Sequence, residues 1–346
     1  MTTMATVHAE VLDEAYERLH RTGPEFAGWL SNHGPMAVDA MIRLGHPDGV
    51  PAWIDRYERR LEEPPGPRWS ISEADWREAL GDASRLGDWL AFFGRLVAAE
   101  PWRDILRRWW PRLIPGAVAA ASHGLIRTGH AVRALGERDT PVRRAELGQA
   151  LGYWAARWHP VPEPGGPRGG LPTGAALDSV PALGVHGGLR TRLAALDRLD
   201  GWPAALRAVA QPTEATRVPA ALTELTDAAV TRYLRWAPAN PVMLVHAATA
   251  PRAAALVVPE LPPDLWPATY TAAWSVSAAI VAMYRSAGDP PSPPASAADD
   301  VVPRAVAHGD EHVLKFTEVA VESADRGNPF ARDAALRAVT DIPVNA

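Results

Sequence analysis

Lysine occurs once in this chain, at Lys315, among 35 lysine and arginine residues. Arginine stays protonated in proteins, whereas lysine can lose its proton and act as a nucleophile, above all where burial disfavours its charge. A neutral Lys315 amine could form a Schiff base with a carbonyl compound. It could also take up carbon dioxide and become a carbamate, which binds a metal ion through oxygen. The simpler alternative is a charged Lys315 paired with a carboxylate such as Asp310 or Glu318.

Histidine is the second residue type that indicates chemistry, because neutral imidazole is the commonest metal ligand in proteins. The chain has 11 histidines and no cysteine, so a metal site here would use nitrogen and oxygen donors without sulfur. Iron, zinc and manganese accept such donors. Five histidines lie in polar or glycine-rich segments, and we expect them at the surface or in loops: His8, His20, His46, His159 and His186.

Near the C-terminus, residues 301–323 have the periodicity of one long helix. At 100° per residue this helix places His308, His312 and Lys315 on one narrow stripe. Its other faces are apolar, which indicates a buried helix with His312 and Lys315 turned inward.

A second helix is predicted over residues 113–135 and is ended by Gly136. It places His123, Arg127 and His130 on one face, at positions i, i+4 and i+7. Two histidines on a face of small residues indicate a ligand site. The alternative is a pair of core histidines whose rings bond to backbone carbonyl groups.

Two further segments each contribute one histidine. His33 precedes a helix predicted over residues 34–45, so its ring can point into a cleft. His246 lies in the apolar segment 242–250, which Pro251 interrupts. Although a lone histidine on an apolar face is more often a core residue than a ligand, several separate segments here present inward histidine or lysine. The combination favours a metal site.

The composition predicts the elements that position these residues. Alanine is abundant, runs of β-branched residues are few, and proline and glycine cluster between the periodic segments. We therefore expect an all-α fold, with a single large helical domain over residues 1–346. Long loops rich in proline and glycine are predicted at 160–173 and 286–298.

Several classes of protein are excluded. A net charge of −5 and a pI near 6.1 give no basic field for nucleic acid. Lys315 precedes Phe316, which rules out a phosphate-binding P-loop, and the glycines at 164–171 lack the strand and helix of a dinucleotide site. Acidic residues in the first 20 positions and a longest apolar stretch of only 270–284 predict a cytoplasmic protein with no membrane span.

Four motifs resemble those of the questin oxidase-like family, in the expected order and from about residue 10 to residue 325. They are Asn32-His33-Gly34-Pro35-Met36, His123-Gly124-Leu125-Ile126-Arg127-Thr128-Gly129-His130-Ala131, His246-Ala247-Ala248-Thr249 and Asp310-Glu311-His312-Val313-Leu314-Lys315. The resemblance implies an all-helical oxygenase that acts on aromatic polyketides. Its members are associated with ring cleavage of anthraquinones such as questin and with a Baeyer–Villiger-like step.

The resemblance also implies non-haem iron held by several histidines and a carboxylated lysine. On the matching motifs, the metal ligands are His33, His123, His246 and Lys315, with His130 as a further ligand. The histidine spacing in the second motif differs from that of fungal members, so Arg127 could instead neutralise an anionic substrate. His312, one turn from Lys315, is assigned either a supporting position beside the ligands or the role of a proton shuttle.

The expected activity is therefore oxygenation or ring cleavage of a quinone- or hydroquinone-type polyketide, with Fe(II) as cofactor. The expected partners are a small aromatic substrate and O2, without nucleic acid or membrane. Some family members use NADPH, but no binding motif for it is present here. Three alternatives remain: a cofactor-independent oxygenase with histidine bases, a metal hydrolase with a carbamylated lysine, and a helical binding protein with core histidines.

Overall fold

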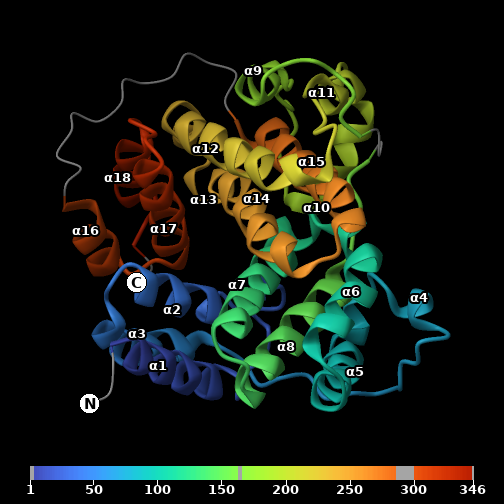
Figure 1. Ribbon diagram of the computed structural model, residues 1–346, viewed down its shortest axis with the longest axis vertical. Coiled ribbons are helices and arrows are strands. Elements are labelled where there is room, and N and C mark those ends of the chain that lie inside the picture. The colour runs from blue at the N-terminus through green and yellow to red at the C-terminus, as the bar shows by residue number, and fades with distance from the viewer. Residues whose placement is uncertain (1–3, 163–165, 286–299, 345–346) are drawn as a thin grey trace.

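A computed structural model describes residues 4–162, 166–285 and 300–344 of the chain. Over these residues the fold is all-α, as expected, and the strands form only a short antiparallel hairpin of β1 (Glu25–Phe26) and β2 (Leu30–Ser31). Figure 1 shows the N-terminal helices beneath the C-terminal helices, with the middle of the chain beside both.

The helices are short to medium in length. The first half of the chain forms α1 (Met4–Leu19), α2 (Gly34–Arg43), α3 (Val50–Tyr57), α4 (Trp76–Ala79), α5 (Leu86–Ala99), α6 (Trp102–Leu113), α7 (His123–Glu137) and α8 (Pro141–Arg157). The second half forms α9 (Thr173–Ser179), α10 (Leu189–Ala195), α11 (Trp202–Ala208), α12 (Val218–Trp236), α13 (Pro241–Leu244), α14 (His246–Val257), α15 (Trp266–Tyr284), α16 (Val301–His308), α17 (Glu311–Asp325) and α18 (Ala331–Asp341).

Helices that lie on opposite sides of the two predicted loops in the sequence pack against one another. In the first loop, the described residues between α8 and α9 are non-helical, as predicted, and the second loop lies outside the described residues. Helix α7 packs against α14, and α2 packs against α17, so elements from both sides of each loop are in contact. A side chain at Gly129 would place its Cβ 2.8 Å from that of Ala253, so glycine permits the close approach of α7 and α14.

Helices α2, α7, α14 and α17 form the centre of the fold and run in the same direction. Their first residues meet at one level, where the rings of His33, His123, His246 and His312 lie together. Six or seven residues further along each helix, a second group of side chains meets. The two levels are therefore roughly 9–10 Å apart along every one of these helices.

The second level is a network of buried ion pairs. Asp39 of α2 accepts hydrogen bonds from His130 (Nδ1 to Oδ2, 2.8 Å) and from Arg133, both of α7. Glu318 of α17 binds Arg133 and also Arg252 of α14 (Nη2 to Oε1, 2.7 Å). Because a buried charge is stable only when it is paired, this network holds the four helices in one register.

The helix predicted over residues 113–135 is wrong over residues 114–122. Helix α6 ends at Leu113, and Pro115 and Gly116 lie in a 3₁₀ turn. Ala120, Ala121 and Ser122 then have positive φ angles of 46°, 55° and 64°. The right-handed helix α7 begins only at His123, so the fold places this histidine at a helix N-terminus rather than in mid-helix.

The long helix predicted over residues 301–323 is two helices. Gly309, with φ of 74°, ends α16, and Asp310 caps α17 by accepting from the backbone N–H groups of His312 and Val313. His308 therefore does not share a stripe with His312; its Nε2–H donates to the carbonyl oxygen of Ile342 at 3.0 Å. A further helix, α18, follows.

One stretch, Pro241–Glu260, is long and apolar enough to cross a membrane by length and composition alone. Within the structure, 72% of its most apolar window is buried, and the stretch is divided between α13 and α14. Its composition is that of core helices. Pro251 lies inside α14 and does not interrupt it, contrary to the prediction; the break falls at Val245.

The ion-pair network gives a direct test of how the central helices are held. Glu318→Gln keeps the shape of the side chain but leaves Arg133 and Arg252 buried without a full counter-charge. We expect the free energy of unfolding to fall by about 3–5 kcal/mol, measured by urea denaturation. In the control Glu137→Gln, an exposed pair with Arg43 is lost, and the expected change is under about 1 kcal/mol. Equal effects of the two substitutions would contradict the interpretation.

Candidate metal centre

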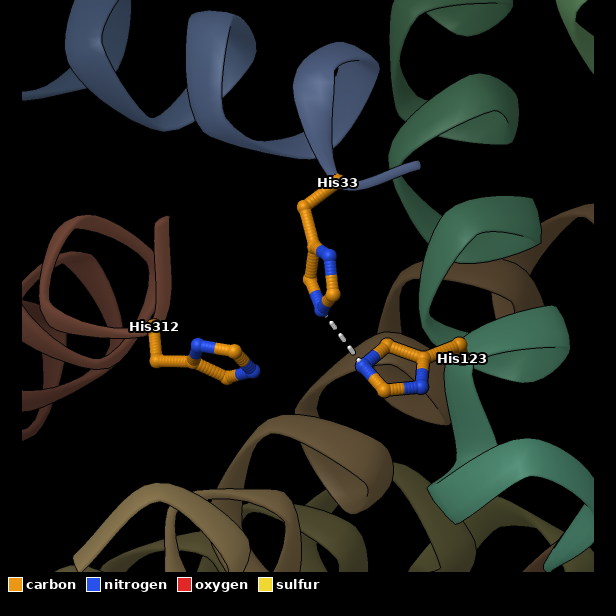
Figure 2. Close-up of side chains that lie close together, drawn as sticks. All are labelled: His33, His123 and His312. Carbon is orange, nitrogen blue, oxygen red and sulfur yellow. Dashed lines mark hydrogen bonds between the residues drawn. The ribbon is translucent and has the colours of Figure 1, made fainter. Parts of the chain in front are cut away.

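Four histidines meet where four helices begin. His33 is the N-cap of α2, His123 and His246 are the first residues of α7 and α14, and His312 is the second residue of α17. All four are buried, and His246 is fully so. Figure 2 shows His33, His123 and His312 reaching from three separate helices toward one common point.

The ring nitrogens are close enough to share one ion. His33 Nε2 lies 2.7 Å from His123 Nε2, which in turn lies 3.0 Å from His246 Nε2. One nitrogen each from His33, His123 and His312 lie within 4.8 Å of one another. The ring centre of His312 is 4.6 Å from that of His33 and 5.4 Å from that of His246.

The second nitrogen of each ring determines its tautomer. The Nδ1–H of His33 donates to the carbonyl oxygen of Ser31 (2.6 Å), and that of His246 to Met243 (3.0 Å). His123 Nδ1–H donates in the same way to the carbonyl oxygen of Ala120. Since a carbonyl group can only accept, Nδ1 carries the hydrogen, and Nε2 of the neutral ring has a lone pair.

Lone pairs that face one another at 2.7 and 3.0 Å need a cation between them. A shared proton is disfavoured, because burial, with Lys315 and the neighbouring imidazoles, lowers the pKa of His33, His123 and His246 well below the usual value. Two imidazoles at right angles on one metal ion, each about 2.1 Å from it, have nitrogens roughly 3 Å apart. The arrangement therefore fits a metal ion.

His312 completes the donor set. Its Nδ1 lies 3.4 Å from the carboxylate oxygen Oδ1 of Asp310, the capping residue of α17. A carboxylate that orients the far side of an imidazole is a frequent partner of metal-binding histidine. In this structure His312 thus has the geometry of a metal ligand, beyond the proton-shuttle role expected from the sequence.

Lys315 lies one turn further along α17 and is 1% exposed. Burial lowers its pKa to about 8, although Glu311 and Asp310 act in the opposite direction. Its Nζ has no hydrogen-bond partner among the described residues. The amine is therefore placed where its neutral form is accessible near neutral pH, next to the group of imidazoles.

The convergence of helix N-termini makes the centre electropositive before any metal binds. Two acidic residues at the start of α17 offset this charge. Asp310 caps the helix, and Glu311, whose Oε1 lies 3.8 Å from His33 Nδ1, also accepts from Arg60 at 2.7 Å. These carboxylates could also bind a cation together with His312, but their existing contacts suit them to orienting and balancing the charge of the histidines.

The position of His123 depends on a strained turn. Left-handed backbone costs about 1–2 kcal/mol per residue for any amino acid other than glycine. Here Ala120, Ala121 and Ser122 adopt it in succession. The turn brings the Ala120 carbonyl oxygen back to His123 Nδ1, which orients the ring. The protein thus stores strain directly beside the candidate metal centre.

Arg127 lies elsewhere, although it was predicted to face the substrate. Its guanidinium forms two parallel hydrogen bonds to Glu146, at 2.6 and 2.8 Å. Glu146 is also bound by His20, whose Nε2 lies 2.7 Å from Oε2. The fold thus commits Arg127 to a buried ion pair between α7 and α8.

His130 is not brought to the other imidazoles either. Seven residues of helix separate it from His123, which is roughly 10 Å along the axis. Its Nδ1 is bound to Asp39 in the ion-pair network. The structure therefore does not support the prediction of His130 as a ligand, and the histidine that lies with the other imidazoles is His312 of α17.

Other contributing residues were missed from the sequence. The carbonyl groups of Ser31, Ala120 and Met243 have no side-chain signature. Asp310 was considered only as a partner for Lys315, although its position as a helix cap two residues before His312 indicates an orienting role. No family model and no curated protein matches this chain, so the resemblance to the questin oxidase-like family stays a prediction.

Metal stoichiometry distinguishes the two candidate fourth histidines. We expect His312→Ala to lower the affinity for Fe(II) or Zn(II) at least tenfold, because it removes one of the converging nitrogens. We expect His130→Ala to keep the wild-type stoichiometry, since Asp39 remains paired with Arg133. Elemental analysis and competition with a chelator measure both. The reverse pattern would contradict this ligand set.

The strained turn makes a second prediction. Ala120→Gly relieves a left-handed conformation that glycine adopts freely, so the free energy of unfolding should rise by about 1 kcal/mol. Ala91→Gly, in the right-handed helix α5, should lower it by about 1 kcal/mol. Thermal and urea unfolding measure both variants. A loss of stability in both would show that the turn is not strained in solution.

Proposed function

We propose that this protein is an O2-dependent oxygenase with a mononuclear non-haem iron centre, acting on a quinone- or hydroquinone-type aromatic polyketide. One observation supports the metal centre above all others: the buried Nε2 of His123 lies 2.7 Å from that of His33 and 3.0 Å from that of His246, while the Nδ1 atoms of all three are held by backbone carbonyl groups. The substrate class and the reaction come from the resemblance of the four histidine-bearing motifs to the questin oxidase-like family.

The number of donors favours iron over zinc. Zinc in proteins usually has four ligands, and catalytic zinc keeps one position open for water. Four imidazoles would fill a tetrahedral zinc site, whereas a six-coordinate metal would keep positions for substrate and O2. The resemblance adds a carboxylated Lys315 as a further oxygen ligand. This donor count argues against the hydrolase alternative.

When bound, Fe(II) would supply the unpaired electrons that let O2 react with an organic molecule. The chain itself has three tasks. His33, His123, His246 and His312 hold the metal. Backbone carbonyls and Asp310 keep the imidazoles in the tautomer that donates Nε2. The third task is to keep water from the centre, and the burial of all four histidines serves this task.

Glu311 and Arg60 lie between the centre and the surface. Glu311 is buried beside His33, and Arg60, half-buried, is paired with it while its guanidinium stacks 4.3 Å from the centre of the Tyr57 ring. Tyr57 in turn accepts a hydrogen bond from the backbone N–H of His33 at 2.6 Å. In the proposal, Arg60 would be the cation that meets the anionic oxygen of a phenol or hydroquinone on this side of the centre.

The proposal includes no bound NADPH, so any reductant acts on the substrate. It places the reaction in the cytoplasm, with small molecules as the partners. The cofactor-independent alternative needs an imidazole whose Nε2 is free to accept a proton from substrate. Here each of the close Nε2 atoms faces another, which weakens that alternative.

Metal content and oxygen uptake test the proposal together. The untagged protein is purified without oxygen, and iron and zinc are measured per chain. We expect about one iron per chain and oxygen uptake with hydroquinones that a chelator abolishes. His246→Ala should lose both, because its nitrogen contacts that of His123, while the exposed control His159→Ala should keep both.

Three results would contradict the proposal. Oxygen uptake that persists in chelator would favour the cofactor-independent reaction. Ester or amide hydrolysis by the zinc form, without oxygen uptake by the iron form, would favour the hydrolase. A protein that binds no metal and tolerates His246→Ala without change would be a binding protein with core histidines.

A further inference from the structure

A cavity of about 520 Å³ lies among α9, α12, α15 and the segment that follows α11. Figure 1 shows α9 and α11 at one end of the molecule and α1 and α3 at the other. Tyr270 of α15 lines the cavity, seven residues before Ser277, whose hydroxyl donates to the carbonyl oxygen of Ala247 beside His246. Seven residues span roughly 10 Å of helix, so the cavity is separate from the metal centre. Its volume is typical of pockets that bind small ligands, roughly 300–1,000 Å³.

The wall of the cavity before α9 is held by backbone contacts. The Leu171 N–H donates to the carbonyl oxygen of Ala208 at 3.1 Å, and the Leu171 carbonyl oxygen accepts from Ala210 at 3.2 Å. A Cβ at Gly169 would lie 2.1 Å from the Ala208 carbonyl oxygen, so glycine is needed for this close approach. Helix α9, which follows, packs against α12. A ligand would therefore meet a preformed cavity and need not order its walls.

One wall is a stripe of α12 that carries two opposite charges. Arg217 caps the helix and Glu224 follows two turns later on the same face, roughly 10 Å along the axis. Ala221 lies between them, and its small side chain leaves space. Neither Arg217 nor Glu224 forms an ion pair with another described residue. A third charged residue of the wall, Asp227, is already paired with Arg326, at 2.6 Å.

Tyr270 adds a hydrogen-bond donor to the inner part of the cavity, although its side chain is only 1% exposed. Burial and the charge of Glu224 raise the pKa of Tyr270 to about 12, and a hydrogen bond with Thr173 acts in the opposite direction. The phenol therefore keeps its hydrogen at neutral pH and can donate it to an oxygen atom in the cavity. Leu171, 40% exposed, and Pro172 add apolar surface beside it.

We propose that this cavity binds a short peptide of about three residues with free ends. Its ammonium group would lie at Glu224, its carboxylate at Arg217, and a peptide carbonyl would accept from Tyr270. Extended chain advances roughly 3.3–3.6 Å per residue, so the ends of a tripeptide match the spacing of the two charges on α12. A guanidinium presents two parallel donors to a carboxylate. A single amino acid carries both charges on one carbon and cannot span them.

Titration calorimetry on the full chain tests this inference with trialanine as the probe. We expect saturable binding at one site per chain, weakening as salt is raised, because both end contacts join partly exposed charges. Trialanine blocked at both ends, by N-acetylation and C-terminal amidation, should bind at least tenfold more weakly. The inference does not rest on the proposed oxygenase function, so the affinity should be the same with and without a chelator.

Peptides blocked at one end assign each contact. Glu224→Gln should weaken trialanine at least threefold but leave N-acetyl-trialanine unchanged, because that peptide has no ammonium group. Arg217→Gln should weaken trialanine to a similar extent but leave trialanine amide unchanged. Glu214→Gln and Arg207→Gln remove exposed charges that do not line the cavity, and both should keep the wild-type affinity.

A further pair of variants tests the cavity itself. Ala221→Leu fills the space between the two charges and should abolish binding. Ala220→Leu, its exposed neighbour outside the cavity, should bind like the wild type. Tyr270→Phe removes the buried donor and should weaken the free and the blocked peptides by the same factor. Circular dichroism establishes that each variant is folded.

Three results would overturn the inference. One is the absence of binding by trialanine at tens of millimolar. Another is equal affinity of the free and the doubly blocked peptide, which would mean that the two charges do not recognise the ends. The third is an equal loss of affinity in the cavity variants and in their controls. None of these results would bear on the metal centre, which metal content and oxygen uptake test separately.

Discussion

The buried ion pairs among α2, α7, α14 and α17 are the interaction on which the candidate metal centre depends. Asp39 and Glu318 each bind side chains of neighbouring helices, and Arg133 binds both of them. A shift of one helix along another would separate an ion pair and leave a buried charge without its partner, so the network resists such a shift. Since the helices run in the same direction, the same register also sets where their first residues meet.

Helix N-termini are unusual places to gather metal ligands, because their dipoles oppose a cation. Here the cost is offset in two ways. Burial lowers the pKa of His33, His123 and His246, which favours their neutral form, and Asp310 and Glu311 add negative charge at the start of α17. A helix start also offers free backbone groups and sharp turns. The carbonyl groups that orient His33, His123 and His246 belong to residues two or three positions earlier in the chain.

The centre proposed here has layers with different tasks. The imidazole level would bind the metal, and the ion-pair level sets the register. Between them, Lys315 has no hydrogen-bond partner among the described residues. A carboxylated Lys315, which the family resemblance implies, would bring an anion next to a metal with neutral nitrogen ligands. It would thereby lower the net positive charge enclosed in a buried space.

The sequence by itself determined the donor types and the fold class. The absence of cysteine and the single lysine are matters of composition, and they limit the donor types. The helical periodicity and the local helix propensity predict the all-α fold. His33, His123 and His246 could be predicted as inward-facing, and the structure brings them together. The bounds of α2 also agree with the sequence, because Gly34-Pro35 is a local start signal.

Only the tertiary structure decided between His130 and His312. The sequence places His130 on the same helix face as His123, and His312 on the same face as Lys315, so it predicts both histidines to face inward. Which of them reaches the other imidazoles depends on how far each helix is shifted along its neighbours. That shift is set by Asp39, Arg133 and Glu318, which come from distant parts of the chain. The left-handed turn at Ala120–Ser122 and the carbonyl acceptors likewise have no local signature, since alanine favours right-handed helix. Position within a site is set by packing at long range, whereas residue type and period are local.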